Sequence, residues 1–157
     1  NPAYTYDISV NQDGSVMAYL VENGTVQSPV IQESIPAYDM YIQSNGKVDA
    51  NYDSSWLFGV LMNLTEINNL ENLDTSYVSN MSSMFRGMDS LTKLDLSGFD
   101  TSNVTDMSYM FHSSSTLTNI NYGSKFIYAN SAHVSGMFSG CPANKPTDSS
   151  WENLSPT

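Results

Sequence analysis

The chain has 157 residues, of which 40% are hydrophobic and 13% charged, and its 16 acidic and 5 basic side chains give a net charge of −11 at pH 7. This length fits one domain with an apolar core. The excess of acid disfavours nucleic acid and anionic lipid as partners, because phosphate binding depends on Lys and Arg. The single cysteine, Cys141, excludes an intramolecular disulfide and a thiolate metal cluster.

No hydrophobic run is long enough to cross a bilayer, and no basic-then-apolar leader is present. The sequence begins at Asn1-Pro2 and ends at Ser155-Pro156-Thr157, as if cut from something longer. We therefore expect a mature or excised ectodomain whose signal and anchor lie outside this sequence. A surface rich in Ser, Thr, Asn and Tyr is common on exported proteins.

Residues 1–36 carry turn signals and no repeat, and they predict a small antiparallel β-hairpin cap. Asp13-Gly14 is a strong hairpin signal, because both central turn residues need positive φ. Residues 16–21 alternate enough to form a strand, and Asn23-Gly24 predicts a second turn.

A calcium loop is the alternative for this region, since Ser9, Asn11 and Asp13 place oxygen side chains at alternate positions. Ser9 stands where the first Asp of such a loop belongs, and Leu20 stands where its closing Glu belongs. The hairpin is therefore the favoured interpretation.

An internal repeat dominates the rest of the chain. The stretch from Asp74 to Phe85 returns as Asp100 to Phe111, with 8 of 12 residues identical at an offset of 26 residues. Self-similarity at such a period predicts a solenoid in which each unit buries its apolar face against its neighbours. Apolar residues one period apart are expected to stack in columns: Leu64, Leu91 and Leu117; Ile67, Leu94 and Ile120; Met84, Met110 and Met137; Phe85, Phe111 and Phe138. A metal or redox role for the methionines is disfavoured, because five of the nine fall in the apolar columns of the repeat, where an adaptable thioether fills a core.

Each unit is predicted to contain a strand, a turn and a short helix. Residues 91–96 have the L-x-x-L-x-L form of a short strand, and residues 104–111 place apolar side chains at helical spacing. The predicted fold class is α/β: a leucine-rich-repeat-like solenoid of about 26–27-residue coils (short parallel strand, turn, short helix) with an N-terminal antiparallel β cap. Its predicted parts are a cap at residues 1–36, the solenoid at 37–140 and a C-terminal cap or linker at 141–157.

The polar residues between the strand and the helix are predicted to be buried or half-buried turn makers. They are Asp74, Thr75, Ser76, Asp100, Thr101 and Ser102. A catalytic dyad of Asp74 and Asp100 is the alternative, but repetition at a structural period already explains both residues.

The stretch from Leu94 to Phe111, L-D-L-S-x-F-D-T-S-N-V-T-D-M-S-x-M-F, resembles the repeat of BspA-like leucine-rich surface proteins of bacteria, including lipoprotein repeats filed as a domain of unknown function. The resemblance spans about Tyr38 to Phe138 and is strongest from Leu64 to Phe111. It implies an extracellular or cell-surface location in the bacterial envelope, with adhesion reported for some members. Residues 126–133 depart from the repeat, and the family has no fixed binding motif.

After Phe138 the prolines Pro142 and Pro146 end the repeat, and Trp151 is expected to fold over the open apolar end. Cys141 is interpreted as a small buried hydrophobe rather than a nucleophile. Neither His112 nor His133 belongs to a recognisable catalytic arrangement.

We find no sequence motif of an enzyme, and we expect no catalytic residues, cofactor or metal. The favoured function is a binding module for a protein or glycan on a host or neighbouring cell, with no nucleic acid and no direct membrane insertion. The alternative is a structural spacer that projects another domain from the envelope. The predicted partner-binding surface consists of Glu66, Asn68, Thr92, Lys93, Asp95, Thr118, Asn119 and Asn121, with Tyr77 and Tyr109 as exposed aromatics.

Overall fold

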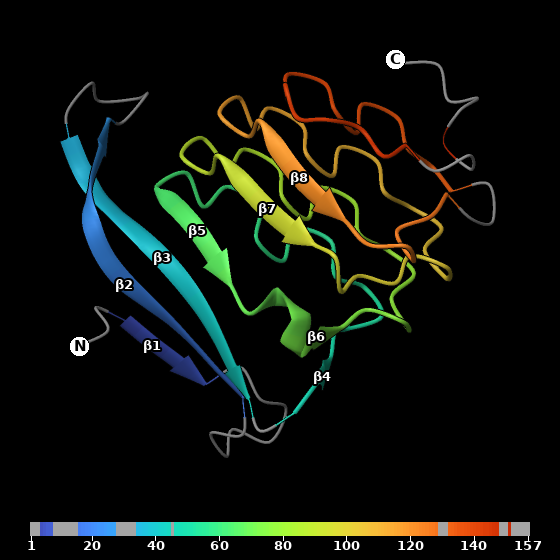
Figure 1. Ribbon diagram of the computed structural model, residues 1–157, viewed down its shortest axis with the longest axis horizontal. Coiled ribbons are helices and arrows are strands. Elements are labelled where there is room, and N and C mark those ends of the chain that lie inside the picture. Colours follow the sequence, from blue (N-terminus) through green and yellow to red (C-terminus); the bar gives the residue numbers. More distant parts are fainter. Residues whose placement is uncertain are drawn as a thin grey trace.

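A computed structural model describes residues 4–7, 16–27, 34–44, 46–128, 132–147 and 151. These residues form eight strands and one 3-10 helix, η1 (Leu70–Asn72). The long strands of the N-terminal part curve along one side of the molecule, and the shorter strands β5, β7 and β8 lie beside them and point in the same direction as one another (Figure 1). No helix among the described residues has the length and apolar character needed to cross a membrane.

The largest sheet has the strand order β1-β2-β3-β5. Strands β1 (Tyr4–Asp7), β2 (Val16–Gln27) and β3 (Ser34–Ser44) pair antiparallel, and β5 (Leu64–Asn68) joins β3 in parallel. The register of β2 shifts between Glu22 and Gly24, where Gly24 has a φ of 137°. The turn predicted at Asn23-Gly24 is therefore wrong: the glycine accommodates a bulge inside one long strand. The predicted turn at Asp13-Gly14 and the alternative calcium loop lie outside the described residues.

Two further sheets have two parallel strands each. Strand β4 (Val48–Asp49) pairs with β6 (Leu73–Asp74), and β7 (Lys93–Leu96) pairs with β8 (Asn119–Tyr122). In the second pair Leu94 lies opposite Ile120. Ile67 lies in β5 and therefore in a different sheet from these two residues.

The predicted fold class is wrong, because the chain is not a solenoid of strand–turn–helix units. The described residues are mainly strands and turns, and the helical ones are the three residues of η1 and Trp151, all in 3-10 conformation. Residues 104–111 were expected to be helical, yet Tyr109 has a φ of 58°, which an α-helix does not admit. The amides of Met107, Tyr109 and Phe111 donate to carbonyls of residues 133–137 instead of to their own segment. Apolar spacing alone does not distinguish such turns from a helix.

Side chains one repeat apart nevertheless pack against each other in the core. The ring centroids of Phe85 lie 5.3 Å from Phe58 and 5.9 Å from Phe111, and Phe111 lies 5.2 Å from Phe138. Met84 and other methionines are fully buried beside these rings. The prediction that the methionines fill the core is confirmed, and apolar burial is the main source of stability here.

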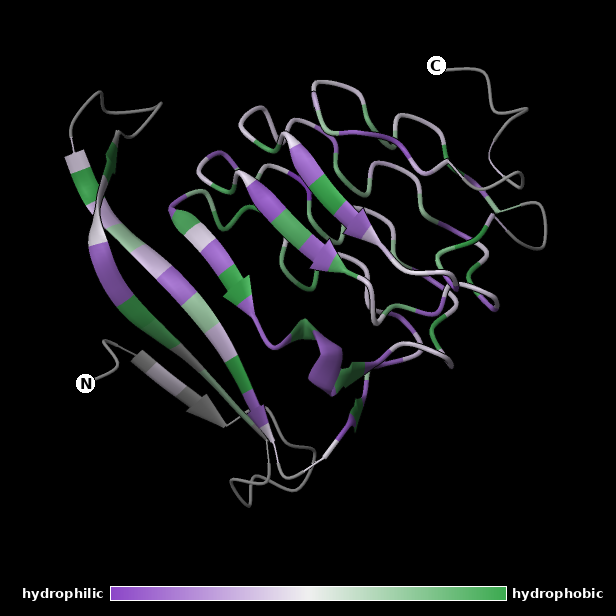
Figure 2. Ribbon diagram, in the orientation of Figure 1, coloured by the Kyte–Doolittle hydropathy of each residue, from purple (hydrophilic) through white to green (hydrophobic). Residues whose placement is uncertain are grey.

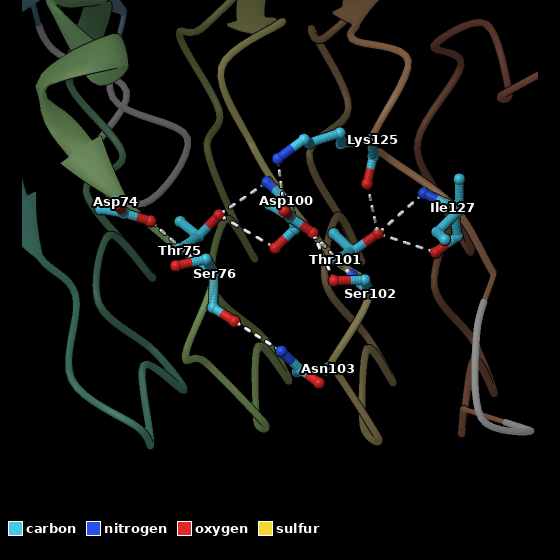
Figure 3. Close-up of polar contacts among 9 residues, drawn as sticks. All are labelled: Asp74, Thr75, Ser76, Asp100, Thr101, Ser102, Asn103, Lys125 and Ile127. Carbon is cyan, nitrogen blue, oxygen red and sulfur yellow. Dashed lines mark hydrogen bonds and ion pairs between the residues drawn. The ribbon is translucent and has the colours of Figure 1, made fainter.

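Neighbouring repeats are also joined through buried threonines (Figure 3). The amide of Asp100 donates to Thr75 Oγ1 at 2.8 Å, and the amide of Ile127 donates to Thr101 Oγ1 at 2.8 Å. Asp100 Oδ1 accepts the amide of Ser102 at 3.1 Å, which closes a local turn. The predicted role of these residues as buried or half-buried turn makers is confirmed.

The C-terminal segment covers the outer edge of β8. Asn144 Oδ1 accepts the amide of Ile120 at 2.7 Å, and Asn144 Nδ2 donates to the carbonyl of Ile120 at 2.9 Å. The side-chain amide of Asn144 thus makes the two hydrogen bonds to Ile120 that a peptide group of a further strand would otherwise make. Trp151 is buried, and its ring stacks on Phe126 with centroids 5.7 Å apart. The three-part division of the chain stays a prediction, and its first boundary, residue 36, falls inside β3.

Candidate functional site

Hydrophobic and hydrophilic residues alternate along β7, and both kinds occur along β5 and β8 (Figure 2). In β7, Leu94 and Leu96 are buried while Lys93 and Asp95 are exposed. This period of two follows from the pleat of a strand. The outward side chains of three parallel strands therefore collect on one face.

That face carries a shallow polar groove with a volume of about 310 Å³. Its lining combines carboxylates, amides and one amine over two apolar side chains. The lining residues are Glu66, Ile67, Asn68, Lys93, Leu94, Asp95, Asn119 and Asn121. We call this surface the β5–β8 groove.

Six of the ten predicted surface residues line the β5–β8 groove: Glu66, Asn68, Lys93, Asp95, Asn119 and Asn121. Thr92 and Thr118 are exposed just before β7 and β8, where Thr118 Oγ1 lies 3.3 Å from the carbonyl oxygen of Thr92. Tyr77 and Tyr109 are exposed, as expected, but neither lines the groove.

Asp95 is the best-defined acceptor of the groove. Its Oδ1 accepts the amide of Ser97 at 2.9 Å and the side-chain amide of Asn121 at 3.1 Å. The pKa of Asp95 is lowered, first by a hydrogen bond from the Ser97 side chain and then by the Ser97 amide. The groove therefore holds a carboxylate that stays ionised at neutral pH.

Two lining residues were not predicted as site residues. Ile67 and Leu94 are predicted only as members of an apolar column, yet both line the groove. Ile67 is half-buried, and this exposure arises because β5 and β7 belong to different sheets. Sequence periodicity carries no signal for such a separation.

No group of three or more His, Cys, Asp or Glu in the described part of the chain is placed to hold a metal ion. Cys141 is half-buried, and burial raises the pKa of its thiol. Its Sγ lies 3.8 Å from the carbonyl oxygen of Leu117. The ring of His112 contacts Ser113 Oγ through Nδ1 at 2.7 Å and packs edge-on against Tyr109.

Comparison with known proteins gives one family match. Residues 53–155 match the model of a family described as Mycoplasma protein of unknown function, DUF285. Neither the curated proteins nor the solved structures include a match to the chain. The matched range contains β5 to β8 and every residue of the groove.

Proposed function

The chain belongs to the DUF285 family, and from the geometry of its outward face we propose that it is a binding module of the bacterial cell surface that engages a protein or glycan partner through the β5–β8 groove. The single observation that carries this proposal is the convergence of six predicted surface residues in that groove. Parallel strands on a rigid core hold these side chains at fixed spacing. Pre-arranged donors and acceptors lower the cost of ordering a site on binding.

The chemistry of the groove suits a neutral, hydroxyl-rich or amide-rich partner. Asn119 and Asn121 each carry both a donor and an acceptor, and Asp95 adds an acceptor beside the amine of Lys93. The net charge of −11 disfavours polyanions at the same surface.

The proposed location is extracellular. The resemblance of residues 94–111 to BspA-like surface proteins supports this location and an adhesive role.

A double substitution in the groove tests the proposal. Lys93→Gln and Asp95→Asn together remove two charges, while the side-chain amide introduced at position 95 keeps an Oδ1 acceptor for the backbone N–H of Ser97. We expect weaker attachment to cells and weaker signals on a glycan array or a panel of purified surface proteins. Lys47→Gln with Glu71→Gln is the matched control, since both residues are exposed and lie outside the groove.

The result that contradicts the proposal is unchanged attachment and binding for the groove variant with its thermal unfolding also unchanged. That result, or the absence of any captured ligand, favours the alternative of a spacer without a ligand.

A further inference from the structure

Arg86 is the only arginine of the chain, and it lies between two aromatic rings. Its Cζ is 5.2 Å from the ring centroid of Trp56 and 5.6 Å from that of Tyr109. The amide of Trp56 donates to the carbonyl of Ser82, and the amide of Ser83 donates to that of Ser108. The segments of Trp56 and Tyr109 therefore flank the segment of Arg86 on opposite sides, and the guanidinium carbon lies over both rings.

No carboxylate of the described residues neutralises this guanidinium. The one ion pair among them joins Lys125 to Asp100 at 3.0 Å, and no hydrogen bond from the Arg86 side chain to a described residue is present. The chain has 16 acidic residues, so acidic side chains are not scarce. With its carbon over two rings and no carboxylate of the described residues beside it, the guanidinium has N–H donors left for an acceptor from outside the chain.

Three residues around Arg86 have a backbone conformation that is unfavourable for their types of side chain. Trp56, Val60 and Tyr109 have φ values of 61°, 59° and 58°, in the left-handed region. The equivalent positions of other repeats hold the small residues Ser83 and Gly136 in one case and Gly87, Ser113 and Gly140 in the other, and for glycine this region is unstrained. Bulky and β-branched residues are rare there.

Burial does not compensate for this strain. The side chains of Trp56, Val60 and Tyr109 remain 48%, 59% and 42% exposed. Where only the turn of the backbone is needed, glycine adopts this conformation without strain, as Gly136 does at the equivalent position. Strained residues of this kind gather at binding sites, where the side chain has a use beyond packing.

Trp, Tyr and Arg are the residue types most enriched among the energetic hot spots of protein interfaces. A planar guanidinium matches a carboxylate through two parallel hydrogen bonds. We propose that Trp56, Val60, Arg86 and Tyr109, here called the Arg86 site, form a docking surface for a protein partner that places an Asp or Glu carboxylate against Arg86.

A protein fits this surface better than a glycan does. One face of Tyr109 lies toward Arg86, and a Cβ at Gly136 would come within 2.6 Å of the same ring, so backbone crowds it there. The guanidinium, Gly136 and the edge-on His112 ring all lie close to the Tyr109 ring, which leaves less of its face for a sugar to stack on. The exposed Trp56 and Val60 suit aliphatic side chains next to the carboxylate. The Arg86 site shares no residue with the β5–β8 groove.

The test is a selection of random 12-residue peptides against the intact chain, followed by titration of the enriched peptides. We expect enriched peptides that share an Asp or Glu, and replacing it by Asn or Gln should weaken binding by at least about tenfold. Arg86→Gln and Arg86→Lys should each cause a similar loss, since lysine keeps the charge but lacks the planar fork. Lys47→Gln, which removes one exposed positive charge outside both the Arg86 site and the β5–β8 groove, is the control and should leave peptide binding unchanged.

A second variant separates binding from folding. Tyr109→Gly places at this position the residue type found at Gly136, so the unfolding temperature should be unchanged or raised while peptide binding falls at least about tenfold. A lowered unfolding temperature with retained binding overturns the proposal. So does a selection that yields no peptide dependent on Arg86 and on a carboxylate. If the selection yields no such peptide, and acidic glycans bind the parent chain but not Arg86→Gln, the proposal of a protein partner is overturned and the ligand of the site is a glycan.

Discussion

Thr101→Val tests whether a single hydroxyl joins neighbouring repeats. Thr101 Oγ1 accepts the amide of Ile127 at 2.8 Å and donates to the carbonyl of the same residue at 2.7 Å. Valine has nearly the same shape, so the substitution removes both hydrogen bonds without opening a large cavity. Thr101 is fully buried and Ile127 is half-buried.

The expected loss of unfolding free energy follows from the amide and the carbonyl of Ile127, which both lose their hydrogen bond to Thr101 Oγ1. An unsatisfied buried donor or acceptor costs about 1–3 kcal/mol, and partial exposure of Ile127 brings the sum for both to about 2–4 kcal/mol. In a domain of this size 1 kcal/mol lowers the unfolding temperature by about 2–4 °C, so about 3 kcal/mol corresponds to about 6–12 °C. Urea titration and thermal unfolding, both followed by circular dichroism, measure the two quantities.

Two comparison variants make the result specific. Thr118→Val removes a hydroxyl that contacts the carbonyl of Thr92 at 3.3 Å on the exposed surface, and water replaces it there, so we expect a change within about 0.5 kcal/mol. Thr101→Ser keeps the hydroxyl and removes one methyl group, with an expected loss of about 1 kcal/mol. If Thr101→Val is no less stable than Thr118→Val, the hydroxyl does not stabilise the packing of the repeats.

Three further changes test other parts of the structure. Phe85→Ala removes the central ring of the buried stack and should cost about 3–5 kcal/mol in urea titration; a loss under about 1 kcal/mol would contradict the packing described. Asn144→Ala uncovers the edge of β8 at Ile120, and light scattering should then show concentration-dependent association, whereas a strictly monomeric variant would mean that the edge is protected otherwise. The pKa of Asp100 is lowered, first by the Ser102 side chain, so its contribution to stability is complete above about pH 4 and is lost as the pH falls further. The stability difference between the parent chain and Asp100→Asn should therefore shrink on acidification, and a difference independent of pH would refute this.

The apolar columns of the repeat were predictable because identical residues at a fixed offset must occupy equivalent environments. Phe85 and Phe111 do stack, and Met84 is buried as expected. The conformation of residues 104–111 was not predictable in this way. Spacing of apolar residues fits a helix and a pair of turns equally well, and only the left-handed Tyr109 and the bonds to the next segment decide between them.

The β5–β8 groove was predicted in part. Alternation in residues 93–96 indicates which side chains point outward, and this fixed the choice of Lys93 and Asp95. It does not indicate that β5 separates from β7, which brings Ile67 to the surface of the groove. The pairing of strands is a property of the whole sheet and has no local pattern.

One residue of the Arg86 site, Tyr109, was predicted as an exposed aromatic of the binding surface, whereas Trp56, Val60 and Arg86 were not predicted. Trp56 and Tyr109 occupy the repeat position that the small residues Ser83 and Gly136 hold in the other units, and a bulky residue at such a position indicates a special role. The stacking of Arg86 between the two rings joins three segments that are distant in sequence. Distances of that kind arise only from tertiary packing.

By itself the sequence determined the repeat, its apolar columns, its turn-making Asp and Thr residues and the outward faces of its short strands, since these depend on residue type and spacing. The tertiary structure decided that the repeat segments are turns without helices, that three separate sheets form, and that Arg86 lies between two aromatic rings. These outcomes depend on which backbone amide finds which carbonyl across segments, and on backbone conformations that neighbouring segments impose.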